Sequence, residues 1–442
     1  MGKTKTFSTQ PENERAYLVG VEFHNKPYLL SISDSLQELS LLAATAGLEI
    51  VGQTNQRLNH PNPATLIGSG KVEEIKIFIE ESHANLVIFD EELSPRHLRE
   101  LEEKFGKDVR VLDRTALILD IFALHANTAE GKLQVELAQY EYLYPRLTRA
   151  WTHLARQAGG GAGRSGSVGG VGLRGPGETQ LEVDRRRART RIAFLKGELE
   201  KVRAHRHQYR QMRKKTQIPI IALVGYTNAG KSTLINQLTH SDVLVADKLF
   251  ATLDPTTRRL KLAGDNTVLI TDTVGFIQKL PTQLIAAFRA TLEEISEADL
   301  LLHIVDVTHP AAIAHWKSVQ NTLEDINCAN IPVITVLNKI DRMINSQHMD
   351  FSKPEWINAI PISAMTGQGI DVLLKRISQE LFETLVPVHV KLPYAQGQLI
   401  SLFHQSGQIE KIEHGVADVK IKGNLPGRLI SKYLPFMINK KS

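Results

Sequence analysis

The sequence predicts an α/β protein in four parts: an N-terminal parallel α/β domain, an antiparallel helical hairpin, a second α/β domain and a small α+β C-terminal domain. Three observations lead to this prediction. Short apolar runs alternate with helical patterns over residues 15–126, and the same alternation returns over residues 217–383. Between them, two apolar seams of period 3.5 flank a glycine-rich stretch. We therefore divide the chain into residues 1–130, 131–216, 217–385 and 386–442.

Composition restricts the class of protein. Hydrophobic residues make up 42% and charged residues 23% of the chain, as in ordinary globular proteins. Cys328 is the only cysteine, which excludes an intramolecular disulfide and fits a reducing compartment. No signal peptide begins the chain, and no apolar run approaches the roughly 18 residues of a membrane span. We expect a cytoplasmic monomer.

The first part reads as a doubly covered parallel sheet. Its helical patterns have apolar residues three and four apart, and its strands are short apolar runs. Strand–helix alternation of this kind implies helices on both faces of a parallel sheet. The predicted strands are "AYLVGVEF", "LEIVGQTN", "ANLVIFDE" and "VRVLDR", and the predicted helices are "SLQELSLLAATAG", "KVEEIKIFIEESH" and "PRHLRELEEKFG".

The second part reads as two helices joined by the loop "AGGGAGRSGSVGGVGLRGPGE". Pro145 interrupts the first seam and is expected to kink that helix. The second helix carries "DRRRARTR" near its start and "RHQYRQMRKK" near its end, so the basic excess of the chain is concentrated here. The seams consist of Leu133, Leu137, Tyr140, Tyr144, Leu147, Trp151 and Leu154, and then of Leu181, Ala188, Leu195, Leu199 and Val202.

The third part contains a phosphate-binding pattern in "IPIIALVGYTNAGKSTLINQL". Gly225, Gly230, Lys231 and Ser232 fit G-x-x-x-x-G-K-[ST] between a strand and a helix. Such a loop turns backbone N–H groups and a helix N-terminus towards the β-phosphate. Lys231 provides a positive charge for the β- and γ-phosphates, and the Ser232 hydroxyl can coordinate Mg²⁺. A chance glycine turn is the alternative interpretation.

Later motifs select the base. "DTVG" sets Asp272 at a strand end and offers the Gly275 amide to a γ-phosphate. "NKID" provides Asp341, which accepts both N1–H and N2–H₂ of guanine; adenine lacks this donor pair and would leave the carboxylate unpaired, at about 1–3 kcal/mol or more. "SAMTG" then supplies Ser363 and the Ala364 amide for guanine O6. The three motifs in order predict GTP, and residues 217–385 read as a P-loop GTPase domain.

These motifs define the predicted site residues. Thr252 of "FATLDPTTRR" is the expected switch threonine on Mg²⁺ and the γ-phosphate, with Thr256 and Thr257 as alternatives. We assign the metal to Ser232, Thr252 and Asp272, and catalysis to Lys231, Thr252 and Gly275. Asn228 either helps to hold K⁺ or shapes the loop. The predicted nucleotide contacts are Gly225, Tyr226, Thr227, Asn228, Ala229, Gly230, Lys231, Ser232, Thr233, Asp272, Gly275, Asn338, Lys339, Asp341, Ser363 and Ala364.

One departure bears on mechanism. In Ras-like GTPases a glutamine after the DxxG glycine orients the attacking water, and here Phe276 takes that place. A phenyl ring cannot orient water, so we expect slow intrinsic hydrolysis that depends on an activator. Phe276 is also suited to packing against the following helix, and both interpretations can hold together.

Two further stretches, "GLRGPGETQLEVDRR" and "PNPATLIGSGKVEEI", resemble the HflX family of translational GTPases, as do "FATLDPTTR" and "DTVGFIQKLP". The resemblance covers nearly the whole chain in domain order. It implies GTP hydrolysis on the large ribosomal subunit and, in several members, separation of stalled or stressed ribosomes into subunits. It also implies that the N-terminal domain and hairpin approach the rRNA. ATP binding or RNA unwinding has been proposed for the N-terminal domain of members.

The charge pattern agrees with an RNA partner, because arginines lie on or beside the glycine-rich loop and few acidic residues balance them. A solvated helix face is the alternative. "GSGK" in the first domain is interpreted as a turn and helix start in preference to a second nucleotide site, and the cluster Asp90–Glu92 as a loop and helix start in preference to a metal site. Two rival functions remain: a signalling switch whose hairpin binds a protein, and an RNA-remodelling ATPase. The candidate RNA contacts are Arg57, Lys71, Arg164, Arg174, Arg185, Arg186 and Arg187.

Overall fold

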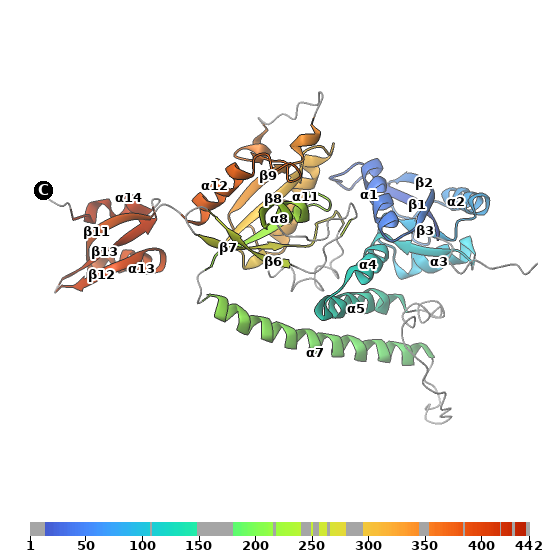
Figure 1. The fold of residues 1–442 in the computed structure, drawn as a ribbon. Helices are drawn as coiled ribbons and strands as arrows, with labels where there is room; N and C mark the ends of the chain where they lie inside the picture. Colours follow the sequence, from blue (N-terminus) through green and yellow to red (C-terminus); the bar gives the residue numbers. More distant parts are fainter. Residues whose placement is uncertain are drawn as a thin grey trace, which may run out of the picture.

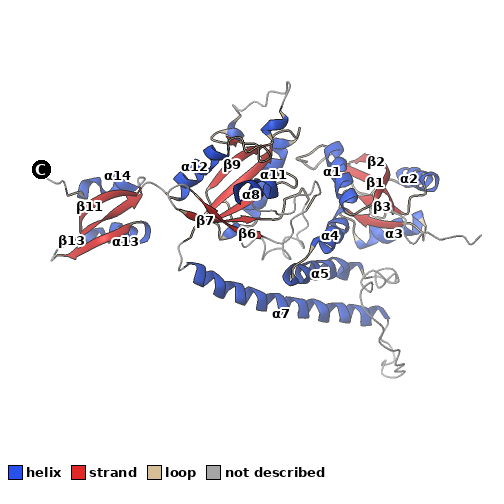
Figure 2. Ribbon diagram, in the orientation of Figure 1, coloured by secondary structure: helices blue, strands red, loops and turns tan. Residues whose placement is uncertain are grey.

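In the computed structural model, the chain forms three β-sheets with their covering helices and one long helical hairpin, whose first helix packs on the N-terminal domain (Figures 1 and 2). Predicted residues outside the described ranges include Thr252, Arg164 and Arg174. The structure describes residues 14–106, 108–147, 180–214, 218–239, 249–250, 256–262, 266–279, 295–343, 353–382, 385–415, 417–426 and 429–438.

The N-terminal sheet is parallel throughout, with strand order β2-β1-β3-β4 and helices on both faces, as the alternating pattern predicts. Side chains alternate across the sheet, so Leu18 packs in the cluster under α1 and α4, whereas Val19 packs in the cluster under α2 and α3. The elements are β1 (Arg15–Phe23), α1 (Ile32–Thr45), β2 (Glu49–Leu58), α2 (Ser69–Ser82), β3 (Leu86–Phe89), α3 (Pro95–Phe105), β4 (Arg110–Asp113) and α4 (Arg114–His125).

The hairpin consists of α5 (Ala129–Leu143) and α7 (Gln180–Lys214). α5 ends just before Pro145, where one 3-10 turn follows, because proline cannot donate to the helical ladder. Leu137 of α5 and Leu195 and Leu199 of α7 form a small buried cluster, three members of the two predicted seams. Figure 1 shows α7 running alongside α5 and on beneath the neighbouring sheet domain.

The central sheet has the order β10-β9-β8-β5-β7-β6, parallel except for β6. β6 is an antiparallel edge strand that includes Thr256 and Thr257, a strand the sequence did not predict. The elements are β5 (Ile220–Gly225), α8 (Lys231–Thr239), β6 (Thr256–Lys261), β7 (Thr267–Asp272), β8 (Leu300–Asp306), α11 (Ala312–Asp325), β9 (Val333–Asn338), β10 (Ile360–Pro361) and α12 (Ile370–Leu381).

The C-terminal unit is a three-stranded antiparallel sheet, order β11-β13-β12, and its apolar face packs on Phe403 and Tyr433. This is the small α+β unit that the sequence predicts. Its elements are β11 (Leu385–Pro393), α13 (Gly397–Ser406), β12 (Gln408–His414), β13 (Asp418–Pro426) and α14 (Ile430–Tyr433).

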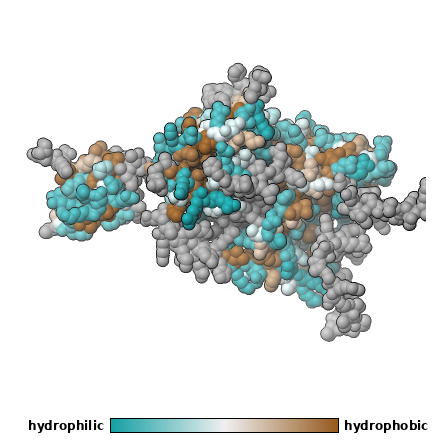
Figure 3. All heavy atoms as spheres, in the orientation of Figure 1, coloured by the Kyte–Doolittle hydropathy of each residue, from teal (hydrophilic) through white to brown (hydrophobic). Residues whose placement is uncertain are grey.

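The N-terminal and central domains share one buried cluster. Phe122 of α4 meets Phe250 edge-on, with ring centroids 4.6 Å apart, and Phe276 lies in the same cluster. The face shown in Figure 3 mixes hydrophilic residues with smaller hydrophobic areas on the described parts. None of the helices among the described residues combines the length and apolar character needed to cross a bilayer.

Candidate active site

The phosphate-binding loop joins β5 to α8 at the carboxyl edge of the central sheet. Two of its glycines have backbone angles that other residues rarely adopt, with φ of +155° at Gly225 and +94° at Gly230. A Cβ at Gly225 would stand 2.4 Å from the Ile304 carbonyl oxygen, and one at Gly230 would stand 2.2 Å from Asn338 Nδ2. Both glycines are therefore required by close packing as well as by conformation.

Lys231 is held inside this loop. Its amino group donates to the carbonyl oxygens of Gly225 at 3.0 Å and Tyr226 at 2.8 Å, and the side chain is buried. Burial lowers the pKa of Lys231 to about 8, although Asp272 opposes the shift. A buried ammonium in a loop rich in N–H groups favours an anionic ligand such as a phosphate.

Ser232 and Asp272 lie side by side across the loop, with the serine hydroxyl donating to Asp272 Oδ2 at 2.7 Å. Asp272 ends β7, which pairs with β5, and so the sheet brings a carboxylate to the first turn of α8. Hydroxyl and carboxylate oxygens are the ligands that Mg²⁺ prefers, so this donor pair fits the metal. Of the alternative switch threonines, Thr257 instead contacts Thr271 within the sheet, Oγ1 to Oγ1 at 3.0 Å.

The "DTVG" segment is docked on the phosphate-binding loop by its backbone. Phe276 N–H donates to the Gly225 carbonyl at 3.0 Å, and Thr227 N–H donates to the Phe276 carbonyl at 2.8 Å. A Cβ at Gly275 would lie 3.1 Å from Lys231 Nζ, which measures how closely this glycine approaches the ammonium. Phe276 is buried, with 2% of its surface exposed, in the cluster that also holds Phe122 and Phe250; the helix expected to follow it falls on residues 280–294, outside the described ranges.

Asn338 connects the loop to the "SAMTG" segment. It donates to the Ala229 carbonyl at 2.9 Å, and its Oδ1 accepts from Ala364 N–H at 2.9 Å. Ala364 N–H, the predicted donor to guanine O6, is thus bonded to Asn338 in this structure. Lys339 forms an ion pair of 2.7 Å with Asp306. The "NKID" and "SAMTG" motifs therefore meet beside the phosphate-binding loop.

The candidate RNA contacts that are described differ in their surroundings. Arg57 pairs with Glu22 at 2.5 Å and Lys71 with Glu74 at 2.7 Å. The residues "GSGK" form the cap and first turn of α2, as predicted. On α7, Arg185 reaches the Leu147 carbonyl at 3.4 Å, whereas Arg186 and Arg187 are exposed and Arg187 lies 3.9 Å from Asp184 of the same helix.

The sequence reading missed a buried polar network between the N-terminal domain and the nucleotide loop. Arg114 is 2% exposed and binds Asp90 Oδ1 at 2.7 Å and Glu38 Oε1 at 2.5 Å. Glu38 in turn accepts from the Tyr226 hydroxyl at 2.6 Å, and Asp90 pairs with Lys279 at 2.6 Å. The one available signal in the sequence is Asp90, directly after a buried strand, where the pattern predicts a loop and helix start and the structure has a buried ion pair with Arg114.

Burial and ion pairing act against each other in this network. Burial raises the pKa of Glu38 above its usual value, even though Arg114 and Tyr226 favour the carboxylate. Burial also favours a higher pKa at Asp90, but the positive charges of Arg114 and Lys279 outweigh it and hold the pKa of Asp90 below its ordinary value. The network therefore depends on Arg114, which compensates both carboxylates.

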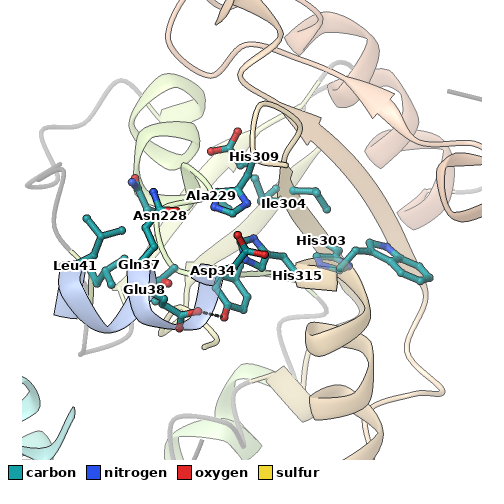
Figure 4. A pocket seen from close by; sticks show the side chains of 16 residues that line it. Asp34, Gln37, Glu38, Leu41, Asn228, Ala229, His303, Ile304, His309 and His315 are labelled. Atoms are coloured by element: carbon teal, nitrogen blue, oxygen red, sulfur yellow. Dashed lines mark hydrogen bonds between the residues drawn. The ribbon is translucent and has the colours of Figure 1, made fainter. Parts of the chain in front are cut away.

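A cavity of about 160 Å³ opens beside the network, between α1 and the central domain (Figure 4). Asp34, Gln37 and Leu41 line it from α1, and the imidazoles of His309 and His315 line it from the other side. The His315 ring stacks on the Tyr226 ring with centroids 3.8 Å apart. The cavity thus adjoins the phosphate-binding loop, whose residues Tyr226–Ala229 also line it.

Comparison with protein families divides the chain into four matched segments. Residues 33–123 match the model described as GTP-binding GTPase N-terminal, and residues 125–213 match GTP-binding GTPase Middle Region. Residues 220–339 match the model described as 50S ribosome-binding GTPase, and residues 352–425 match the HflX C-terminal domain. The third match contains the phosphate-binding loop and "DTVG", and it ends within "NKID", at Lys339.

Curated relatives match along nearly the full chain. The GTPase HflX of Caldanaerobacter subterraneus subsp. tengcongensis is 43% identical over 97% of this chain and 95% of its own length. The GTPase HflX of Escherichia coli is 43% identical over 92% of both chains. Among solved structures, the SsGBP and GDP complex covers 83% of this chain and 98% of its own at 26% identity, with a TM-score of 0.47.

Proposed function

Because the chain belongs to the HflX family of GTPases, we propose that it binds the large ribosomal subunit, is activated there to hydrolyse GTP, and splits stalled or stressed ribosomes into subunits. GTP hydrolysis itself follows from the family and from the P-loop domain. The ribosomal partner and the splitting are the proposal. The observation that carries it is the match of residues 220–339 to a 50S ribosome-binding GTPase.

Each residue at the phosphate and metal site has a proposed role that its position supports. Lys231 neutralises charge on the β- and γ-phosphates, and the Gly275 amide donates to the γ-phosphate beside it. Ser232 and Asp272 hold Mg²⁺, which supplies further charge neutralisation. Thr252 remains the proposed third group on the metal.

Base recognition is proposed for the edge formed by "NKID" and "SAMTG". The Asp341 carboxylate accepts hydrogen bonds from guanine N1–H and N2–H₂, and Ser363 and the Ala364 amide bind guanine O6. Asn338 holds the end of β9 against the loop through its bond to Ala229, and in this structure it also accepts from the Ala364 N–H that the proposal gives to guanine O6. Asn228, with a left-handed φ of +58°, is the residue proposed to help hold K⁺.

Phe276 gives a physical reason why GTP hydrolysis by this protein depends on the ribosome. Its ring is buried and cannot orient water, so the water-positioning group must come from elsewhere. A large-subunit activator supplies that need. Among the candidate RNA contacts, Arg186 and Arg187 are exposed on α7, and they are the residues proposed to meet RNA phosphates.

The proposal is tested with purified ribosomes. Intact ribosomes incubated with the protein and a non-hydrolysable GTP analogue should separate into subunits on a sucrose gradient, and GDP should support much less separation. Ribosomes that remain intact in both conditions would remove splitting from the proposal while leaving subunit binding to be judged separately.

Hydrolysis rates in K⁺ and Na⁺ at equal ionic strength test whether Asn228 helps to hold K⁺; equal rates exclude that role.

A further inference from the structure

Tyr226 follows the first glycine of the phosphate-binding loop, and its side chain leaves the loop towards the N-terminal domain. The hydroxyl makes two hydrogen bonds there. It donates to Glu38 Oε2 at 2.6 Å, the bond drawn as a dashed line at Glu38 in Figure 4. It also accepts from the main-chain N–H of Gln278 at 2.9 Å. One phenol therefore links the loop, the N-terminal domain and the segment after "DTVG".

The second bond extends the backbone docking of that segment. Gly225 and Thr227 already hold Phe276 through two backbone hydrogen bonds on either side of Tyr226. The Tyr226 hydroxyl adds a third point of attachment two residues later, at Gln278. Gly275 lies just before these attachments and packs against Thr227 and Lys231. Fixing residues 276–278 therefore limits how far Gly275 can move from Lys231.

The hydroxyl is itself held rigidly. The ring is 6% exposed and stacks on His315 at 3.8 Å between centroids. Glu38, the acceptor, is buried and bound by Arg114 through its other oxygen. The Gln278 side chain is tied to the same region, with Nε2 donating to Ser35 Oγ at 2.6 Å. A donor and an acceptor at fixed positions leave the hydroxyl one orientation.

We propose that Tyr226 is a positioning residue for GTP hydrolysis: its hydroxyl, oriented by Glu38, holds the segment after Gly275 so that the Gly275 amide faces the γ-phosphate. Tyr226 does not touch the reacting atoms with this hydroxyl and acts through the main chain of Gln278. GDP has no γ-phosphate, so the bond contributes to binding of GTP and to its hydrolysis but leaves GDP binding unaffected.

The test is Tyr226→Phe in the full-length protein, with Tyr433→Phe as the matched control. Tyr433 is also buried and donates one hydrogen bond, to the Leu399 carbonyl, but it belongs to the C-terminal domain. Tyr226→Phe should lower kcat about ten-fold and lower the affinity for a non-hydrolysable GTP analogue relative to GDP by a similar factor. GDP affinity should stay within about two-fold of the wild type, which also reports that the variant is folded.

Tyr433→Phe should leave kcat and nucleotide preference unchanged. An unchanged kcat in Tyr226→Phe would overturn the proposal. Equal losses of GDP and GTP-analogue affinity would also overturn it, since they indicate a merely structural role in the loop.

Two further variants locate the path of the effect. Gln278→Ala keeps the main-chain N–H and should retain most of the wild-type kcat; a loss as large as that of Tyr226→Phe would place the effect in the side chain instead. Glu38→Gln should lower kcat less in the Tyr226→Phe background than in the wild type. Equal effects in both backgrounds would contradict the claim that Glu38 acts through Tyr226.

Discussion

Replacing Arg114 with methionine tests the buried network most severely. The guanidinium is 2% exposed and is bound to Glu38 and Asp90, which are themselves buried. Methionine fills similar space without charge, so two carboxylates lose their shared cation in a site of low dielectric. Removing one partner from a buried ion pair costs about 3–5 kcal/mol, and we expect Arg114→Met to lose that much stability at pH 7.5.

Urea unfolding followed by circular dichroism measures this loss. Arg99→Met is the control, because Arg99 is half exposed and pairs with Glu100 at 3.2 Å, a contact expected to contribute less than about 1 kcal/mol. Burial already raises the pKa of Glu38, and without Arg114 this carboxyl should take a proton more readily, so the loss should shrink as pH falls. Equal losses for the two variants, or a loss at Arg114 below about 1 kcal/mol, would refute the reasoning.

Three other changes have defined outcomes. Gly230→Ala should reduce GDP affinity at least about ten-fold in a fluorescence titration, because its Cβ would stand 2.2 Å from Asn338 Nδ2 at a φ of +94°; near-normal affinity would contradict this packing. Asp341→Asn should move the hydrolysis preference from GTP towards XTP, since an amide donates where the carboxylate accepted, and an unchanged preference would remove Asp341 from the base site. Burial raises the pKa of Asp120 from 3.8 to about 6, so ionising this carboxyl lowers stability progressively between these two pH values and to the full extent above about pH 6. Asp120→Asn should therefore stabilise the protein by up to about 3 kcal/mol at pH 7.5 and by nothing below pH 4 in urea unfolding; a gain independent of pH would contradict this cause.

Periodic and local features of the fold were predictable from the sequence. The two inner strands of the N-terminal sheet, β1 and β3, are largely apolar runs because helices cover both faces, and "LVIF" of β3 is buried at every position. The phosphate-binding loop was predictable because its glycines are required by local geometry. β6 was missed because "TTRRLK" is a charged, largely exposed edge strand with only Leu260 buried.

The interdomain contacts were not predictable from local pattern. Tyr226 and Glu38 are 188 residues apart, and nothing near either one in sequence specifies the other. Arg114 similarly looks like a solvated charge, since buried arginines are rare, and only the fold brings two carboxylates to it. Phe276 was the partial exception, because an aromatic residue at a position that Ras-like GTPases give to glutamine indicated packing in place of water positioning.

The central claim is a GTPase activated by the large ribosomal subunit, and its most direct test is hydrolysis together with co-sedimentation. The intact protein is mixed with purified large subunits, with small subunits as the control, in GTP, GDP or a non-hydrolysable GTP analogue. Large subunits should raise kcat steeply and should pellet the protein with the GTP analogue far more than with GDP, in a manner that weakens with salt. Neither activation nor GTP-dependent pelleting with large subunits would contradict the account and favour a switch that binds a protein partner.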